Sequence, residues 1–100
     1  MYYVYIIWSS INNKIYVGYT SDLKSRLQAH NEGNDGYTKK FRPWKLIYYE
    51  AYLSEKDARE RERKLKYRGR AKALVKMRLK NSFHEVRKVL GEGTSRIRRC

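Results

Sequence analysis

Two short alternating runs, separated by a turn, open the chain and constrain its fold most. Residues 2–8 alternate between two faces rich in tyrosine and β-branched side chains, as a β-strand does. One face holds Tyr3, Tyr5 and Ile7, and the other holds Tyr2, Val4, Ile6 and Trp8. Residues 9–13, Ser-Ser-Ile-Asn-Asn, have turn chemistry because asparagine tolerates positive φ. Residues 14–19 form the second run, so an antiparallel hairpin is predicted.

The next segments predict a helix, a loop and a third strand. The helix is expected to begin at a cap on Thr20 or Ser21 and to run to about Asn31. Residues 31–43 contain two glycines and a proline, which is typical of a loop. Residues 44–52 are rich in aromatic side chains and are expected to form the third strand.

Two further helices are expected after the third strand. Ser54 is expected to begin the first of them, with Asp57 completing a variant capping box. Gly69 interrupts this helix, and another is predicted over residues 70–80. The resulting order, β-β-α-β-α-α, predicts an α+β domain in which helices pack on a small antiparallel or mixed sheet.

The length of 100 residues allows one small domain with a modest core. We expect this domain over residues 2–80, a short C-terminal helix over 81–90 and a flexible basic tail over 91–100. The single cysteine, Cys100, leaves no internal disulfide and fits a reducing compartment. The apolar start is too short to span a bilayer and lacks a basic flank, so a cytoplasmic protein without a membrane partner is expected.

Positive charge dominates the composition and points to a polyanionic partner. Lysine and arginine outnumber the acids by 24 to 10, which gives a net charge of +14. Residues 63–80 hold nine basic side chains and no acid, and the loop adds Lys39, Lys40 and Arg42. Such a surface favours phosphate neutralisation and a nucleic-acid partner. A solubility surface that binds RNA non-specifically is the alternative that charge alone leaves open.

Glu62 breaks the pattern of the second helix. Ala58 and Leu65 mark the inward face, and Glu62 lies between them at helical spacing. An inward carboxylate needs a cation, because burying it unpaired is costly. An arginine could supply that charge in an ion pair, and so could a metal ion. Glu60 points elsewhere and is expected to be solvated.

Arg26 and His30 are four residues apart and share one face of the first helix, beside its apolar stripe. Arginine can clamp a phosphate in a bidentate manner, and histidine titrates in the range that suits proton transfer. The ordinary alternative is a helix-end histidine beside a surface arginine.

On the second strand, Gly18 shares a face with Tyr16 and is expected to leave space beside it for a bulky group.

The order and spacing of these segments resemble the GIY-YIG endonuclease family. The two family motifs correspond to Tyr3-Val4-Tyr5 and Tyr16-Val17-Gly18. The family's helix corresponds to Thr20-Ser21-Asp22-Leu23 and Arg26-Leu27-Gln28-Ala29-His30, and its acidic segment corresponds to Glu62-Arg63-Lys64-Leu65-Lys66. The small standalone bacterial subgroup, the UPF0213 or YhbQ-like proteins, is resembled at Tyr37-Thr38 to Arg42-Pro43, at Leu46 to Glu50 and at Lys66-Tyr67-Arg68-Gly69-Arg70-Ala71-Lys72.

This resemblance implies a three-stranded antiparallel sheet flanked by helices and a nuclease that depends on one divalent ion, Mg²⁺ or Mn²⁺. It implies that Tyr5 and Tyr16 are the motif tyrosines of the catalytic site. It also implies that Arg26 binds phosphate and that Glu62 is the sole protein ligand of the metal. His30 occupies a position that holds histidine or tyrosine across the family.

The sequence therefore predicts a metal-dependent nuclease that hydrolyses phosphodiester bonds in DNA, structured or single-stranded, in repair or recombination. The leading glycine of the first family motif is Tyr3 here. Because Tyr5 is retained, this departure weakens the family assignment more than it weakens the implied nuclease chemistry. The basic residues expected to hold the nucleic acid are Lys39, Lys40, Arg42, Lys66, Arg68, Arg70 and Lys72. The alternatives are a non-catalytic basic nucleic-acid-binding module with a nuclease-like fold and a small protein that binds an acidic partner.

Overall fold

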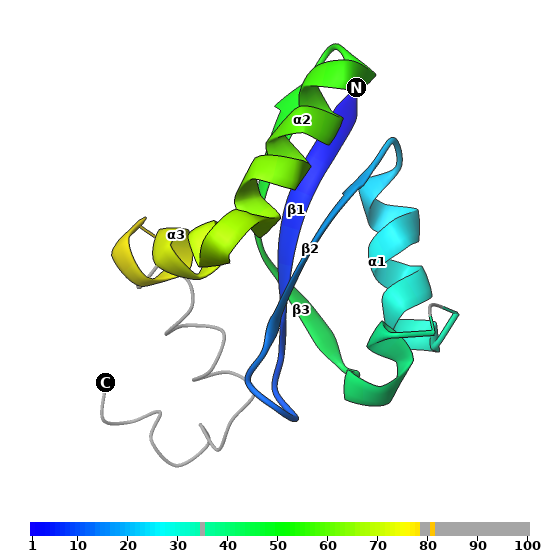
Figure 1. Cartoon of the computed structure of the whole chain (residues 1–100). Helices are drawn as coiled ribbons and strands as arrows, with labels where there is room; N and C mark the ends of the chain where they lie inside the picture. The colour runs from blue at the N-terminus through cyan, green and yellow to red at the C-terminus, as the bar shows by residue number, and fades with distance from the viewer. Residues whose placement is uncertain (35, 79–80, 82–100) are drawn as a thin grey trace.

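A three-stranded antiparallel sheet with helices on both faces forms the fold (Figure 1). The computed structural model describes residues 1–34, 36–78 and 81. The strands β1 (Tyr2–Ser9), β2 (Ile15–Thr20) and β3 (Trp44–Tyr52) lie in the order β2-β1-β3, so β1 is central and β2 is an edge strand. The predicted α+β class and antiparallel sheet are confirmed. The expectations for residues 82–100 lie outside the described residues.

Helical segments cover each face of the sheet. Helix α1 (Leu23–Glu32) and the 3₁₀ turn η1 (Thr38–Phe41) lie on one side. Helix α2 (Glu55–Lys66), the 3₁₀ turn η2 (Tyr67–Gly69) and helix α3 (Arg70–Arg78) follow β3 and lie on the other. The order of strands and helices matches the predicted one.

Strand alternation separates two apolar clusters. Tyr5 and Ile7 of β1 pack with Trp44 on the α1 side of the sheet. The opposite face of β1 packs on α2 and α3, in a cluster of Val4, Ile6, Trp8, Val17, Ile47, Ala58, Leu65, Ala71 and Val75. The predicted faces of β1 are therefore confirmed, and tyrosine contributes to the core.

The hairpin turn and the helix starts depend on asparagine, aspartate and serine. Asn13 has a φ of 60°, and its side-chain oxygen accepts a hydrogen bond from Nε1 of Trp8 at 2.9 Å. At the start of α1 the cap is Asp22, whose carboxylate accepts from the backbone N–H of Ser25 at 3.1 Å. The predicted cap at Thr20 or Ser21 is wrong, because the Thr20 hydroxyl instead accepts from the N–H of Asp22 at 3.0 Å.

Helix α2 begins after Ser54, as predicted, but the Ser54 side chain makes no capping hydrogen bond. Its two first-turn acids, Glu55 and Asp57, instead lie where negative charge favours a helix N-terminus. The predicted break at Gly69 is confirmed, since Arg68 and Gly69 have positive φ values of 49° and 70°. This break turns the chain from α2 into α3.

A half-buried ion pair fixes α2 to β3. The guanidinium of Arg61 donates two hydrogen bonds to the carboxylate of Glu50, at 2.8 and 2.9 Å, and Tyr48 and Tyr52 donate their hydroxyls to the same carboxylate. Burial alone would raise the pKa of Glu50, but these donors hold that pKa at about 2, below its ordinary 4.5. Burial and the bond to Glu50 raise the pKa of Tyr52 to about 12.

Candidate functional site

Three buried side chains form a hydrogen-bonded chain between β1, α1 and η1. The hydroxyl of Tyr5 lies 2.8 Å from Nε2 of His30, and Nδ1 of His30 lies 2.8 Å from the hydroxyl of Thr38. Tyr5 is 1% exposed, and the other two are fully buried. The backbone carbonyl of Thr38 accepts a hydrogen bond from Nε1 of Trp44 at 2.8 Å. Both ring nitrogens of His30 are thus matched to hydroxyl groups that can each donate or accept a proton.

The burial of His30 follows from the apolar stripe of α1. Leu23 and Leu27 pack against Tyr5, Ile7 and Trp44, and His30 continues the same stripe one turn later. His30 lies in the last turn of α1, as in the helix-end alternative, but it is fully buried.

Gly18 makes room for Tyr5. The two residues are directly paired across the β1–β2 ladder. A Cβ atom at position 18 would collide with the hydroxyl oxygen of Tyr5. The expectation that Gly18 leaves space for a bulky group is therefore confirmed, and the group that fills this space is the Tyr5 ring.

Tyr16 of β2 joins this cluster from the edge of the sheet. Its ring centre lies 5.2 Å from that of His30, in an edge-on arrangement, and 6.2 Å from that of Trp44. The Tyr37 ring stacks on Tyr16, with centres 6.0 Å apart and planes 28° apart. Tyr16 is half-buried, whereas Tyr5 lies beneath the surface. The structure thus brings Tyr5, Tyr16 and His30 together.

Lys66 connects Glu62 to the cluster of Tyr5, Tyr16 and His30. The ammonium Nζ of Lys66 lies 3.1 Å from Oε2 of Glu62 and 5.8 Å from the ring centre of Tyr16. The Glu62 side chain is only 21% exposed, between the buried Ala58 and Leu65, so its predicted inward position is confirmed. The cation that the structure pairs with Glu62 is a lysine one turn later, and not the arginine considered from sequence. The metal-ligand role stays a prediction.

The donor set at Glu62 fits a hard divalent cation. Mg²⁺ is usually held by one or two carboxylates, with waters and substrate phosphates supplying the remaining oxygens. Glu62 provides one such carboxylate, whose Oε2 atom is paired with Lys66. Among the described residues, no three His, Cys, Asp or Glu side chains gather into a group that could hold a metal ion. A single ion shared with a phosphate is therefore the type of metal site that these residues suit.

Arg26 is half-buried on α1, whereas Glu60 is exposed on α2. Arg26 is half-buried and lies one turn before His30 on α1, so it shares the helix face of that histidine. Its phosphate-binding role stays a prediction. Glu60 is solvated as expected, with 54% of its side chain exposed and its carboxylate 3.8 Å from Arg63.

A groove of about 400 Å³ runs along the β2 edge beside Tyr16. Tyr37 and Tyr16 line one part of it, and the side chains of Lys14, Lys66 and Lys72 also line it. The groove therefore lies between the two helical layers, next to the half-buried Tyr16.

The other predicted nucleic-acid-binding residues are not among those that line this groove. Lys39 and Lys40 are exposed on η1, two and three residues after Tyr37 in the chain. Arg68 and Arg70 place their guanidinium groups 5.0 and 5.8 Å from the ring centre of Tyr67. Arg42 reaches back to the end of α1, where a Cβ on Gly33 would meet its guanidinium.

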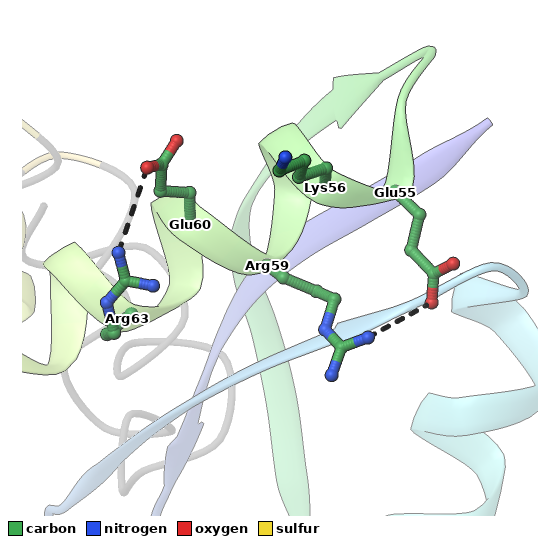
Figure 2. A pocket seen from close by; sticks show the side chains of 5 residues that line it. All are labelled: Glu55, Lys56, Arg59, Glu60 and Arg63. Carbon is green, nitrogen blue, oxygen red and sulfur yellow. Dashed lines mark ion pairs between the residues drawn. The ribbon is translucent and has the colours of Figure 1, made fainter.

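A second hollow, of about 340 Å³, is lined by charged residues of α2 (Figure 2). Its charges are mixed and paired, because Arg59 lies 3.9 Å from Glu55 and Arg63 lies 3.8 Å from Glu60. It contains none of the predicted catalytic or metal-binding residues, and its pattern is that of an ordinary solvated helix face.

Sequence reasoning missed the roles of Tyr37, Thr38 and Trp44. Tyr37 and Thr38 lie in a loop without periodic patterning, where neither burial nor stacking has a local signal. Trp44 opens β3, and its indole bond to Thr38 depends on the path of the preceding loop. The Lys66 partner of Glu62 did have a signal, since Glu and Lys four residues apart commonly pair on a helix.

Comparison with known proteins assigns this fold and cluster to a class. The sequence model described as the GIY-YIG catalytic domain matches residues 1–80. The chain therefore belongs to the GIY-YIG family, an endonuclease superfamily, which implies nuclease chemistry, divalent metal use and a nucleic-acid substrate in general terms.

Within this family, the chain is similar to proteins named UPF0213. A UPF0213 protein of Bacillus pumilus is 34% identical over 94 residues, covering 89% of this chain and 95% of that protein. Another, from Staphylococcus haemolyticus, is 39% identical over 66 residues, covering 65% of this chain and 79% of the relative. The solution NMR structure of a UPF0213 protein from Bacillus halodurans aligns with a TM-score of 0.50 at 30% identity, covering 79% of this chain and 87% of that one.

No helix in the described part of the chain has the length and apolarity needed to cross a membrane.

Proposed function

We propose that this protein is a metal-dependent nuclease that hydrolyses phosphodiester bonds in structured or single-stranded DNA, in the cytoplasm and in the service of DNA repair or recombination. One observation carries the proposal. Tyr16 lies at the groove with His30 against one part of its ring and the Lys66–Glu62 pair near another. Family membership supports nuclease chemistry in general. The arrangement around Tyr16 adds residues that suit the activation of a water molecule and the binding of a phosphate.

Hydrolysis requires a water molecule that is oriented and relieved of a proton. Tyr16 is suited to that task because it is half-buried and lines the groove. Tyr5 is too deeply buried to meet the water, so we assign it to positioning His30. His30 contacts the Tyr16 ring and bonds to Tyr5 and Thr38, so it orients Tyr16 and can pass a proton inward.

The negative charge of the reacting phosphate requires cationic partners. Arg26 would bind its non-bridging oxygens, since a guanidinium fits two phosphate oxygens at once. Glu62 would hold one Mg²⁺ or Mn²⁺ ion, which supplies Lewis-acid stabilisation of the phosphate and leaving group when bound. Lys66 would then exchange its contact with Glu62 for a phosphate oxygen of the strand.

The basic surface would hold the substrate in place. Lys66 and Lys72 line the groove directly, and Lys39 and Lys40 follow its lining residue Tyr37 by two and three positions in the chain. Each contact would release a counterion, so binding weakens as salt increases.

The alternative function is a non-catalytic nucleic-acid-binding module with a nuclease-like fold. One observation favours it: Lys66 already supplies the positive charge that Glu62 requires. If Lys66 always stays paired with Glu62, that carboxylate does not hold a metal ion. The protein would then bind nucleic acid without cutting it.

A cleavage screen separates the two functions. Purified protein is incubated with duplex, flapped, nicked and single-stranded DNA and with matched RNA, with Mg²⁺ or Mn²⁺ or with excess EDTA. The nuclease proposal predicts cleavage of at least one DNA substrate that EDTA abolishes and that Glu62→Ala lacks. Binding that EDTA leaves unchanged, with no substrate cleaved, supports the binding module instead.

A further inference from the structure

Tyr37 is exposed but held firmly by its aromatic neighbours. It is 52% exposed, in the segment just before η1. Its ring stacks on Tyr16, and the Phe41 ring meets it edge-on, with centres 5.6 Å apart and planes 66° apart. An aromatic ring that is oriented by neighbours and still open to solvent can stack on another flat group with little loss of conformational entropy.

The groove beside Tyr37 combines an apolar lining with positive charge. Ile15, Val17, Leu65 and Ala71 contribute the apolar part. Three lysines line the same groove: Lys14, Lys66 and Lys72. Aromatic and apolar surfaces suit the flat face of a nucleobase, and ammonium groups suit the phosphates that flank it.

The groove is large enough to receive a small ligand group. Its volume of about 400 Å³ is at the low end of small-molecule sites, which span about 300–1,000 Å³. That space accommodates one nucleotide. A paired base keeps its faces covered by the stack and must leave the duplex before its face can meet a side chain.

We propose that Tyr37 stacks on one unpaired nucleobase of a bound DNA strand and thereby makes this protein select unpaired over duplex DNA. The inference deepens the proposed function, on which it rests for the DNA substrate. Tyr37 is a specificity-determining residue in this account, because its ring continues the stack that Tyr16 begins. The phosphate of the stacked nucleotide then lies beside Lys66 and close to Glu62.

The test measures binding without cleavage. Fluorescence anisotropy follows titration of a labelled oligothymidylate and, separately, a labelled blunt-ended DNA duplex of two strands, both in EDTA. Tyr37→Ala is expected to weaken oligothymidylate binding by about 5- to 150-fold, since one base stack contributes about 1–3 kcal/mol. Its affinity for the duplex is expected to stay within about twofold of the original, because the lysines that contact phosphates are intact.

Two variants control for folding and for simple loss of an aromatic ring. Tyr37→Phe keeps the ring and is expected to bind oligothymidylate like the unmodified protein. Tyr49→Ala removes an equally exposed tyrosine from β3 and is expected to leave both affinities unchanged. Unchanged oligothymidylate binding by Tyr37→Ala would overturn the inference, as would an equal loss on both probes.

Because EDTA prevents metal-dependent cleavage, the outcome is independent of the nuclease proposal. A selective loss in Tyr37→Ala upholds the stacking role even if the screen finds no cleaved substrate. Cleavage that Glu62→Ala abolishes, together with unchanged binding by Tyr37→Ala, overturns the stacking role and leaves the nuclease proposal standing.

Discussion

The phenol oxygen of Tyr5 lies 2.8 Å from Nε2 of His30, and both side chains are buried between the sheet and α1. The Thr38 hydroxyl meets the other ring nitrogen at the same distance of 2.8 Å. Removal of either hydroxyl therefore leaves a buried nitrogen without its partner, which costs more than the hydrogen bond itself contributes. This cluster stabilises the fold and also holds the side chains that the proposed chemistry uses.

Replacing Tyr5 by phenylalanine should lower the free energy of unfolding by about 1–3 kcal/mol, because Nε2 of His30 loses its partner. Urea denaturation at pH 7 measures the change. Tyr49→Phe is the matched control, since Tyr49 is 52% exposed. The control should change stability by less than about 0.5 kcal/mol. Equal effects of the two substitutions would contradict the role given to the Tyr5–His30 bond.

Gly18→Ala should destabilise the protein by about 1–3 kcal/mol, because the added methyl group meets the Tyr5 ring and the packed core resists displacement. Gly36→Ala is the control, since a Cβ there has nothing within 4 Å. Thermal denaturation compares the two variants. If Gly18→Ala melts at the same temperature as Gly36→Ala, the close approach of Tyr5 to β2 is not as described.

Acid should weaken the fold through Glu50. The folded-state pKa of about 2 lies below the ordinary 4.5, so its contribution to stability is complete above about pH 4.5 and is lost as the pH falls toward 2. After allowance for solvent screening, we expect a loss of about 1–2 kcal/mol over that range. Urea denaturation at pH 5 and pH 2.5 measures it. Glu50→Gln should show a smaller loss than the unmodified protein, and equal losses would contradict the contribution of the Arg61 pair.

The basic groove should determine how DNA binding depends on salt. Lys72→Gln should reduce the slope of log affinity against log salt concentration by about 0.7, the value expected when one phosphate contact to a single strand is lost. Lys24→Gln, an exposed position on α1, carries the same change in net charge. Titration of labelled oligothymidylate at several salt concentrations compares them. A similar loss of slope in both variants would show that net charge, and not the groove, governs binding.

Much of the fold could be predicted because alternation and helical spacing are local signals. The two faces of β1 follow from residues 2–8, and the inward position of Glu62 follows from Ala58 and Leu65. The cap of α1 could not be fixed because Thr20, Ser21 and Asp22 can all cap a helix. The three-dimensional fold selects Asp22.

The contacts of the candidate site depend on residues far apart in the chain. The Tyr5–His30 bond joins residues 25 positions apart, and no periodic pattern in either segment encodes it. The space next to Gly18 was visible from sequence, but its occupant was not, because the direction of the Tyr5 ring depends on the position of α1. The stacking of Tyr37 on Tyr16 depends on the path of the whole loop between α1 and β3.

The most direct test of the central claim is nicking of supercoiled plasmid DNA with Mn²⁺ by four proteins: the unmodified chain, Glu62→Ala, Tyr16→Phe and Glu60→Ala. Glu60 is the matched control, because it lies on the same helix and is solvated. We predict that Glu62→Ala and Tyr16→Phe each reduce the nicking rate by about 100-fold or more, with DNA affinity nearly unchanged, and that Glu60→Ala nicks normally. Nicking by both Glu62→Ala and Tyr16→Phe at the unmodified rate would contradict the account.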